Sequence, residues 1–367
     1  MTRDGTFDFS HLRFVPREFY TEMHSGHIQS GDILVVKDGA TTGKTAFVSA
    51  DFPLKEAVVN EHVFVCDPDE NLVVPKYLFF WLWGPSGQTA IRSNYRGAAI
   101  GGINQSFADT ILVPVPPLPE QQRIAALLTE QMAAVERARA AAEAQLAAAK
   151  ALPAAYLRAV FESDEAKRWP VKPLADVCDL RAARSIANDG DTDVMAITTA
   201  CLTEKGFRPA GIKPAKMWAR DAAECIVATG EILIARSNTP ELVGRVAMYD
   251  GYPSGVVASD LTIRISPGAD LNPVFLTGYL SFLYLTGYWK ARAGGASGSM
   301  KKITRSQLQA ESIPIPTLPD QQKVAAGLLK RMNTTDAMQR SLEAQMAAIN
   351  ALPGALLRRA FGLATEG

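Results

Sequence analysis

The chain contains the same long stretch of sequence twice. PVPPLPEQQRIAALL begins at Pro114 and PIPTLPDQQKVAAGLL begins at Pro314, and the offset of 200 residues continues without a gap to the end of each copy. The similarity extends upstream, where SGDILVVKDGATTGKTAFV begins at Ser30 and TGEILIARSNTPELVGRVAMY begins at Thr229. Because this period is far longer than that of solenoid repeats, it indicates duplication of a whole domain. We therefore expect two globular units, each followed by a long helix.

The first globular unit is shorter than the second at its beginning. The second opens with KRWPVKPLADVCDLRAARS from Lys167, whereas MTRDGTF at the start of the chain aligns with TEKGF near Thr203. The first unit is therefore expected to lack the opening elements of the second. The expected fold is α+β with a pseudo-two-fold repeat, in which α/β globular units at 1–117 and 163–316 alternate with long helices at 118–162 and 317–367.

Composition indicates a folded protein of the reduced cytoplasm. The chain has 367 residues, 47% of them hydrophobic, which leaves room for two domains. Its four cysteines are scattered without a CxxC pair, which argues against zinc sites and a disulfide framework. No secretory signal is evident. The uncharged run 271–289 is long enough to raise the question of a membrane span, but it contains a proline and two glycines and predicts a buried helix instead.

The net charge is zero, which argues against a simple nucleic-acid binder with a general basic excess. A net charge of zero does not exclude a local basic patch, because only the DNA-binding face needs to be positive. Arg92 with Arg96, and Lys301 and Lys302 with Arg305, form two clusters just before equivalent points of the repeat. The alternative for each cluster is an ordinary solvated surface. Their matched positions favour a function, and we take them as candidate DNA contacts.

Both long stretches are rich in residues that favour helix, such as Ala, Leu, Met, Glu and Gln. A seam recurs every seven residues at Leu128, Val135, Ala142 and Ala149, and again at Leu328, Thr335, Leu342 and Ile349, with companion positions three residues after each. This pattern predicts that the two helices pack together as an antiparallel coiled coil. Gln145 and Gln345 would then form a buried polar pair. The alternative is that each helix lies on its own globular unit.

Such helices would hold two equivalent units at a set distance. A helix from Pro119 to Ala151 would span roughly 50 Å at 1.5 Å per residue. Equivalent readers one turn apart on B-form DNA are separated by about 34–36 Å. The arrangement therefore suits a DNA target with two separated parts.

The glycine-rich stretch DGATTGKT invites interpretation as a phosphate-binding loop. That motif requires four residues between its first glycine and the GK pair, and only three separate Gly39 from Gly43. The flanking ILVV and TAFV predict a strand hairpin instead. Polar residues of the two hairpins are candidate contacts to phosphates or base edges, namely Lys37, Thr41, Thr42 and Lys44, then Arg236, Ser237, Asn238 and Thr239, with Asn104 and Gln105 nearby in the repeat. The alternative is that these residues only form the turns.

No catalytic constellation is evident in the sequence. The four histidines all lie in the first globular unit, so they are not part of a duplicated function. LNPVF at Leu271 lacks the second proline of the NPPY-like motif used for methyl transfer to an amino group. We therefore expect a reader of DNA that is not an enzyme and that holds no metal or cofactor.

The duplicated PLPEQQ helix opening, with the hairpin inside each preceding unit, resembles the specificity subunit of type I restriction–modification systems. The resemblance covers essentially the whole chain. It implies that 1–117 is a target recognition domain shortened at its start, that 163–316 is a second one, and that both read double-stranded DNA. It also implies that the helices dock two methyltransferase subunits and that a restriction subunit joins the complex. Candidate partner contacts are Glu120, Gln121, Gln122 and Arg123, with Asp320, Gln321, Gln322 and Lys323.

Two other functions remain open from the residues. A coiled-coil adaptor that recruits proteins without touching DNA would suit the neutral charge. A nucleotide-hydrolysing enzyme would need the glycine-rich stretch to bind phosphates. A neighbouring methyltransferase gene and an assay of ATP turnover would distinguish these alternatives from a DNA reader.

Overall fold

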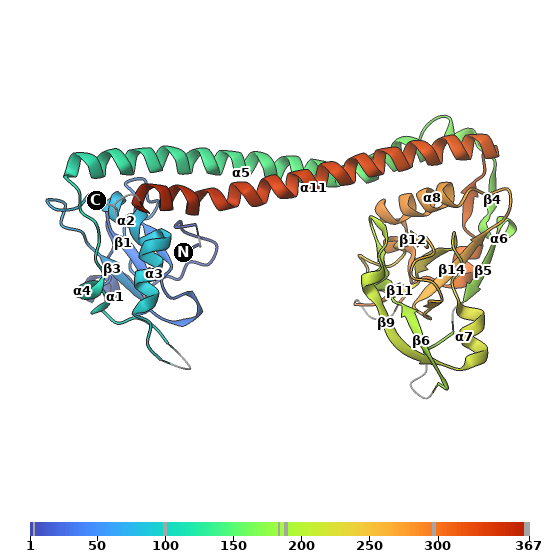
Figure 1. Cartoon of the computed structure of the whole chain (residues 1–367), viewed down its shortest axis with the longest axis horizontal. Helices are drawn as coiled ribbons and strands as arrows, with labels where there is room; N and C mark the ends of the chain where they lie inside the picture. The colour runs from blue at the N-terminus through green and yellow to red at the C-terminus, as the bar shows by residue number, and fades with distance from the viewer. Residues whose placement is uncertain (3, 98–100, 183, 187–189, 296–298, 363–367) are drawn as a thin grey trace. The chain divides into compact units, whose positions relative to one another are not determined.

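The computed structural model describes residues 1–2, 4–97, 101–182, 184–186, 190–295 and 299–362. The chain forms two compact units (Figure 1). Unit 1 comprises Met1–Ala144 and Glu343–Gly367, and unit 2 comprises Gln145–Leu342. Two long helices, α5 at Leu118–Phe161 and α11 at Leu318–Gly362, each contribute to both units. Each unit therefore consists of a globular part and a stretch of both helices, and the α+β fold with a repeated domain is confirmed.

Unit 1 is built on a three-stranded antiparallel sheet. The strand order is β2-β1-β3, with β1 at Ile33–Val36, β2 at Thr45–Phe47 and β3 at Val63–Cys66. The helices of the globular part are α1 at Arg17–Glu22, α2 at Pro75–Trp83, α3 at Pro85–Ser93 and α4 at Phe107–Thr110. Helix α2 carries the apolar run YLFFWL, and its Tyr77 ring meets Phe361 of α11 at 5.3 Å between centroids. The end of α11 thus completes the core of unit 1.

Unit 2 has a sheet of the same design with one more strand. Its order is β12-β10-β14-β5, with β5 at Cys178–Ala182, β10 at Ile232–Ala235, β12 at Val246–Met248 and β14 at Thr262–Pro267. The adjoining helices are α8 at Pro273–Leu285 and α9 at Tyr288–Arg292. Phe275 of α8 packs against Phe161 at the end of α5, with 5.6 Å between ring centroids. The end of α5 thus completes this core, as the end of α11 does in unit 1.

Unit 2 also carries elements outside this sheet. A second sheet has the order β13-β6-β9, with β6 at Thr192–Ile197, β9 at Ile212–Met217 and β13 at Val257–Ala258. Three short ribbons pair β4 at Val171–Pro173 with β16 at Ser312–Pro314, β7 at Leu202–Thr203 with β8 at Gly206–Phe207, and β11 at Ser237–Asn238 with β15 at Lys301–Lys302. Short helices are α6 at Leu174–Val177, α7 at Ala219–Cys225 and α10 at Arg305–Gln309.

The two sheets share one ladder register, which confirms the repeat. Ile33 pairs with Cys66 in unit 1, and Ile232 pairs with Ile265 in unit 2. The hairpin partners agree as well, because Ile33 pairs with Phe47 as Ile232 pairs with Met248. These strand positions thus have counterparts 199 to 201 residues later along the chain. β4, α6, β5 and β6 of unit 2 have no counterpart among the described residues of unit 1.

The two long helices pack against each other within each unit and run antiparallel. In unit 1, Val135 and Ala142 of α5 share a buried apolar cluster with Ile349 of α11. In unit 2, Arg331 of α11 lies over the Tyr156 ring of α5, 5.4 Å from its centroid. Low numbers on one helix meet high numbers on the other, so mutual packing is confirmed. Each helix also packs on a globular part, so both alternatives from the sequence hold at once.

The predicted seam is only partly right. Seven of its eight positions are buried and Leu342 is partly buried, but most companion positions, including Gln145 and Gln345, are exposed. The predicted buried pair of these glutamines is therefore wrong. The inward companions lie four residues after each seam position, as Met132, Leu146 and Gln339 show. The residues three and four positions after a seam residue lie on opposite sides of the seam. Which of the two sides is buried depends on where the globular parts pack.

Gln339 occupies one of these inward positions and compensates for a proline in the neighbouring helix. It donates a hydrogen bond to the backbone carbonyl that the proline cannot bond. Pro153 lies inside α5 and has no N–H for the carbonyl of Ala149, which precedes it by four residues. The Gln339 side chain, 5% exposed, donates its Nε2–H to that carbonyl at 3.1 Å. Its repeat counterpart is Arg139, which donates to Asn350 Oδ1 at 3.1 Å. The polar bond between the helices thus differs between the two units.

The uncharged run 271–289 lies in α8 and α9, as a buried helix should. Leu276 and Leu280 of α8 are fully buried in the core of unit 2. Among the described residues, no helix is both long and apolar enough to cross a membrane.

Candidate DNA interface

The glycine-rich stretch of unit 1 is a strand hairpin, as the sequence predicts. β1 and β2 pair on either side of it, and a single 3-10 turn covers Gly39–Thr41. Gly39 and Gly43 have φ values of +78° and +85°, which side-chain-bearing residues rarely adopt. Thr42 Oγ1 donates to the Gly39 carbonyl at 2.7 Å and so caps the turn. No helix follows the loop, so a phosphate-binding loop of the strand–loop–helix kind is absent here.

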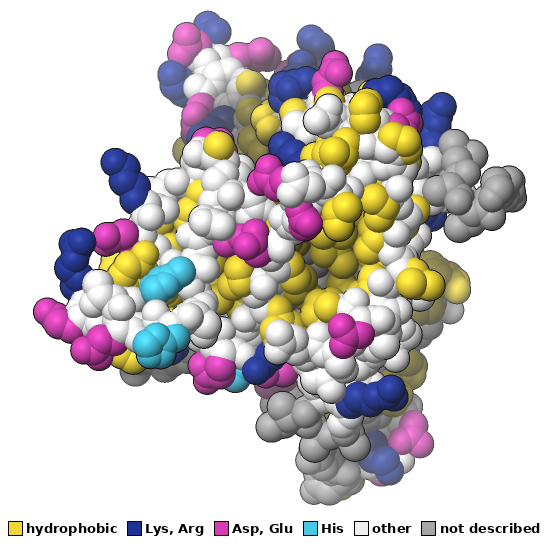
Figure 2. All heavy atoms as spheres, turned by 90° about the vertical axis from the view of Figure 1, so that its left-hand side faces the viewer, with side chains coloured by type: hydrophobic (Ala, Val, Ile, Leu, Met, Phe, Trp, Pro, Cys, Tyr) yellow, Lys and Arg dark blue, Asp and Glu magenta, His cyan; other side chains and the backbone are white. Residues whose placement is uncertain are grey.

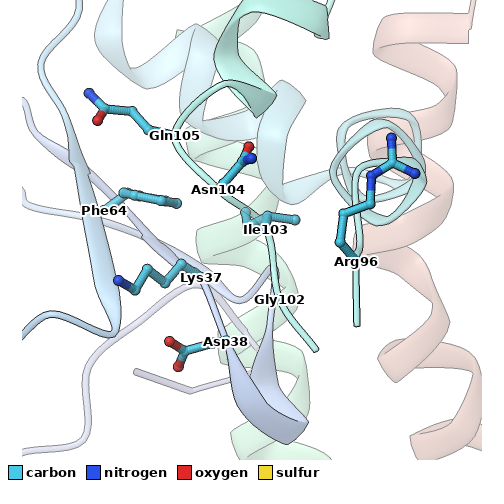
Figure 3. Close-up of a pocket in the computed structure, with 8 residues that line it drawn as sticks. All are labelled: Lys37, Asp38, Phe64, Arg96, Gly102, Ile103, Asn104 and Gln105. Atoms are coloured by element: carbon cyan, nitrogen blue, oxygen red, sulfur yellow. The ribbon is translucent and has the colours of Figure 1, made fainter. Parts of the chain in front are cut away.

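The hairpin loop lies beside residues 101–105, which are distant in sequence. Asp38 bridges to Gly102, and the Ile103 N–H donates to the Lys37 carbonyl at 2.7 Å. An open pocket of about 500 Å³ forms between the two segments (Figure 3). Its lining residues are Lys37, Asp38, Phe64, Arg96, Gly102, Ile103, Asn104 and Gln105. Four of the predicted DNA contacts therefore meet around one pocket.

The pocket of unit 1 combines an aromatic face with side chains of both charges. The Lys37 ammonium lies 5.8 Å from the centroid of the Phe64 ring, within range of a cation–π interaction. The Asp38 carboxylate is held by His62, whose Nδ1 lies 2.8 Å from it. Figure 3 shows the Arg96 side chain on the far side of the pocket from Lys37. Neither Lys37 nor Arg96 forms an ion pair within the described part of the chain, so both charges are available to an anion.

Four other candidates of unit 1 lie outside the pocket lining. Thr41 is exposed at the tip of the hairpin, and Thr42 is used to cap the turn. The Lys44 ammonium lies 3.5 Å from the Met1 carbonyl. Arg92 is exposed in the last turn of α3. The structure therefore groups these residues with the hairpin and with α3 and not with the pocket.

Unit 2 brings its candidates together on a two-stranded ribbon. β11 follows the β10 strand end, and β15 comes from the segment that corresponds to residues 101–105 of unit 1. Asn238 pairs with Lys301, and Ser237 pairs with Lys302. The Asn238 Oδ1 atom accepts from the Thr239 N–H at 2.9 Å, which leaves its amide NH₂ group to bind elsewhere. Ser237 is only 6% exposed, because its strand turns the side chain inward, so it offers little surface to DNA.

The ribbon of unit 2 is positively charged without compensation. Arg236, Lys301, Lys302 and Arg305 make no ion pair with any acidic residue that the structure describes. Nearby cations do find partners, since Arg245 lies 3.5 Å from Glu204 and Lys290 lies 3.5 Å from Glu241. The contrast separates the candidate residues from the paired cations around them.

The pocket and the ribbon occupy the same place in their units. The Ile103 N–H donates to the Lys37 carbonyl in unit 1, and the Ile303 N–H donates to the Arg236 carbonyl at 2.8 Å in unit 2. In the same way, Arg96 exchanges both backbone bonds with Gly102, as Gly294 does with Lys302. Two segments that are far apart in sequence thus form one equivalent surface in each unit.

A family model of the type I restriction modification DNA specificity domain matches residues 18–142 and 166–345, which together make up most of the chain. The chain belongs to this family. The match covers both globular parts and most of the helix pair. The role of a specificity domain is DNA recognition, and the catalytic steps of such a system belong to other subunits.

Curated relatives agree with this membership. The specificity subunit of the type I restriction enzyme StySPI from Salmonella potsdam is 21% identical over 98% of this chain and 80% of its own length. The corresponding EcoBI subunit from Escherichia coli is 25% identical over 45% of this chain and 34% of that subunit. The chain thus spans about a third of the EcoBI subunit in that alignment.

Solved structures show the same fold. A chain from a structure titled for complex assembly and conformational transition of the type I R-M system gives a TM-score of 0.73 at 21% identity, covering 93% of this chain and 84% of that chain. The HsdS subunit from Thermoanaerobacter tengcongensis gives 0.60 at 20% identity, covering 91% and 81%.

The helix-opening motif of this specificity domain is mainly structural. Gln121 is fully buried, accepts the Val74 N–H at 2.8 Å, and donates to the carbonyls of Leu72 and Pro116. Gln321 repeats all three bonds in unit 2, with Asn272 in the place of Val74. These two glutamines therefore have an internal role, because each closes the loop before α2 or α8 onto its own long helix.

The other residues of the motif remain accessible. Gln122, Arg123, Gln322 and Lys323 are exposed at equivalent positions of α5 and α11. Glu120 and Asp320 are partly buried. The Arg123 guanidinium donates to Glu120 at 2.7 Å and lowers the pKa of that carboxyl. Thr317 Oγ1 donates to Asp320 at 2.5 Å in the first turn of α11.

Sequence analysis missed Phe64 and the Asp38–His62 pair in the pocket. Phe64 lies within an ordinary strand pattern, and its stack on Phe107, with 5.6 Å between centroids, joins residues that are distant in the sequence. Phe64 stands where unit 2 has the fully buried Ile263, and nothing in the sequence of the two strands predicts this difference in burial.

Proposed function

We propose that the two units read the two halves of a bipartite double-stranded DNA site, each through the surface formed by its hairpin and the segment beside it. The uncompensated cations of the β11–β15 ribbon are the observation that carries this proposal. Arg236, Lys301, Lys302 and Arg305 come from two segments, and the fold gathers them at one edge of unit 2. Backbone phosphates would supply much of the affinity there.

Base discrimination would come from side chains with two hydrogen-bonding atoms. Asn and Gln suit the adenine edge, and Arg suits the guanine edge. Gln105 and Asn104 at the pocket of unit 1 and Asn238 on the ribbon of unit 2 hold such positions, and all three have at least part of their side chains accessible. The Phe64 ring in unit 1 adds an apolar face for a base or a thymine methyl group.

The helix pair would serve as the spacer and as the docking surface for other subunits of the restriction–modification system. The exposed pairs Gln122 with Arg123 and Gln322 with Lys323 occupy equivalent positions. Two equivalent surfaces support docking of two methyltransferase subunits, with the restriction subunit joining that core, in the cytoplasm where these systems meet DNA. Insertion of a heptad into each helix should change the tolerated spacer without changing either half of the target.

The test of DNA binding uses the chain assembled with the methyltransferase subunit of its host. The double substitution Lys301→Ala with Lys302→Ala should weaken binding to all sequences and lower the slope of log K against log salt by about 1 to 2. A matched control replaces Lys172 and Lys213, two exposed lysines of unit 2 that lie outside the ribbon. The control should leave both affinity and slope unchanged.

Base recognition needs a separate measurement. Asn238→Ala should relax the preferred sequence in one half of the target only, as measured by selection from a randomised DNA library. Gln105→Ala should act in the same way on the other half. If the ribbon double substitution changes neither affinity nor slope, the ribbon does not bind DNA. If the library preferences are unchanged by both single substitutions, these side chains do not read bases.

A further inference from the structure

The outer edge of β3 lacks a partner strand among the described residues of unit 1, although its counterpart in unit 2 has one. β3 is the last strand in the order β2-β1-β3, whereas β14 lies between β10 and β5. Five residue pairs join β14 to β5, including Arg264 with Arg181 and Ile265 with Leu180. Since β3 and β14 pair with their inner neighbours in one register, the position of a fourth strand in unit 1 is defined.

The peptide groups of β3 are oriented to accept such a strand. The Lys37 N–H donates to the His62 carbonyl at 2.9 Å, which identifies this pair as a hydrogen-bonded one. Bonded and non-bonded pairs alternate along an antiparallel ladder, so the N–H and C=O groups of Val65 face outward. An exposed edge of this kind is a template for another strand.

The side chains around this edge are apolar and incompletely covered. Phe64, Cys66 and Val113 are partly exposed, and they pack against the core of unit 1. Their counterparts Ile263, Ile265 and Ile313 are each 0% exposed. Two further apolar residues of the flanking segment lie in solvent, since Leu112 is 88% and Val115 is 56% exposed.

A space-filling view shows that hydrophobic side chains are exposed on this side of the molecule (Figure 2). Hydrophobic side chains gather in a broad, hollowed band on the face of the molecule that contains unit 1. Isolated exposed apolar residues are normal on a protein surface, but a continuous band is typical of an interaction site.

Unit 2 shows what covers the equivalent surface. β4 pairs with β16, α6 follows, and β5 then pairs with β14. Leu174, Cys178 and Leu180 of this strand–helix–strand segment are at most 9% exposed and belong to the main core of the unit. One continuous stretch, Val171–Ala182, therefore covers both the outer edge of β14 and the segment that forms β16.

Charge gives a second indication of what would cover this edge. Asp32 in unit 1 is 2% exposed and forms no ion pair with the residues described, and burial raises the pKa of its carboxyl. Its counterpart Glu231 lies 2.8 Å from Arg264. The pKa of Arg181 on β5 is raised mainly by Asp179, which lies 2.6 Å away, and Glu231 adds a smaller contribution. Unit 1 has Val65 in the place of Arg264, so a basic residue on an added strand would face an uncompensated acid.

We propose that the outer edge of β3, with the flanking residues 111–115, is a docking site for a strand–helix–strand segment of a different protein and not of a second copy of this chain. The occupant resembles Val171–Ala182, with apolar residues at the positions of Leu174, Cys178 and Leu180 and a basic residue at the position of Arg181. It adds a fourth strand to the sheet of unit 1 by β-augmentation. The inference concerns a protein partner and does not depend on DNA binding.

The test uses a labelled peptide with the sequence RWPVKPLADVCDLRA, which is residues 168–182 of this chain. Because unit 2 already holds its own copy of this segment, the peptide should bind the full chain once per molecule, as measured by fluorescence anisotropy. Hydrogen exchange should show new protection at Val63–Cys66 and none in β14. A control peptide with Leu174→Asp and Leu180→Asp should bind at least about tenfold more weakly, because two buried leucines are lost.

A variant of the chain locates the binding edge. Val65→Pro removes an outward N–H without removing a bond to β1, and it should weaken peptide binding by about tenfold or more. Leu127→Ser, at an exposed apolar residue of α5, serves as the control and should leave binding unchanged. Thermal unfolding verifies that both variants fold. If Val65→Pro does not fold, the comparison of the peptide with its control peptide still tests binding to the unsubstituted chain.

Three results would overturn the proposal. The first is absence of saturable binding by the peptide. The second is equal binding of the control peptide or protection that maps outside β3. The third is a free chain that sediments as a dimer with Val63–Cys66 already protected, because a second copy would then be the occupant.

Discussion

β3 of unit 1 and β14 of unit 2 pair with their inner neighbours in the same register, yet they differ in environment. All four residues of β3 are partly exposed, whereas the first four residues of β14 are at most 3% exposed. β5 and the segment around it account for the difference, because they cover the outer edge of β14. The comparison shows that local sequence sets the ladder, while neighbouring segments set how deeply the same strand is buried.

The two strands also differ in charge chemistry. Arg264 of β14 binds Glu231 through two guanidinium nitrogens and donates to the carbonyls of Glu224 and Ile226. Val65 of β3 offers none of these bonds, and Asp32 is left buried without a cation. Duplicated domains can therefore keep a backbone arrangement while one of them loses the polar network that holds its parts together.

Removal of the arginine should produce the largest effect. Arg264→Ala leaves the buried Glu231 carboxylate without its partner and should lower the free energy of unfolding by about 3–5 kcal/mol. The equivalent Val65→Ala should cost about 1 kcal/mol, because it removes only partly buried methyl groups. Chemical denaturation followed by hydrogen exchange of peptides from each unit measures the two costs. Equal costs in the two units would contradict the contrast between β3 and β14.

The motif glutamines should behave alike in both units. Gln121→Ala and Gln321→Ala each leave a buried backbone N–H without an acceptor, which should cost about 2–3 kcal/mol in the unit concerned. The exposed neighbours Gln122 and Gln322 serve as controls, and their replacement by Ala should change stability by about 0.5 kcal/mol or less. Hydrogen exchange of α2 and α8 reports each unit separately. A large difference between Gln121 and Gln321 would mean that their identical bonds are not equally important.

The helix pair should show a smaller asymmetry. Gln339→Leu removes the donor for the Ala149 carbonyl and should cost about 1–2 kcal/mol. Arg139→Ala removes a more accessible bond to Asn350 and should cost less than about 1 kcal/mol. Thermal unfolding of the two variants under the same conditions measures the order. The reverse order would show that the proline in α5 is tolerated without help from α11.

The smallest effect concerns pH. Burial raises the pKa of Asp32 above its ordinary value of 3.8, so the folded state favours the protonated form. The stability that this group contributes is present at acidic pH and is lost as pH rises through the raised pKa. Asp32→Asn should therefore stabilise unit 1 at neutral pH, by less than about 1 kcal/mol, and flatten the pH dependence there.

The counterpart Glu231→Gln should have the opposite sign at neutral pH, because it weakens the bond to Arg264. Unfolding measured between pH 4 and pH 8 tests both variants. The Gln29 N–H already donates to this carboxylate at 2.7 Å, so destabilisation by Asp32→Asn at neutral pH would show that the carboxylate also has a cationic partner.

Several elements could be predicted from local sequence. The hairpin of unit 1 followed from ILVV and TAFV with glycines at the turn, and both long helices followed from their composition and repeated openings. The candidate residues Lys301 and Asn238 were each recognised from the repeat. Their direct pairing across a ribbon was not foreseen, because the bond joins segments 63 positions apart and no local pattern encodes such a contact.

The burial that the sequence did not predict has one physical cause. Ser237, Gln121 and Gln321 are polar residues in motifs that looked functional, and the structure buries all three. A polar side chain is buried only where hydrogen-bond partners meet it. Those partners, such as the Val74 N–H, come from other elements, so the motif itself cannot reveal whether the residue faces inward or outward.

The amino-acid sequence by itself determined the duplication, the positions of the long helices and of the first hairpin, the turn glycines and the family. These depend on periodicity, propensity and resemblance along the chain. Only the tertiary structure decided which side of the helix seam is covered, which polar residues are buried, and that β3 keeps an open edge. Such properties depend on which distant segments pack together, because burial removes a side chain from water only when another part of the molecule covers it.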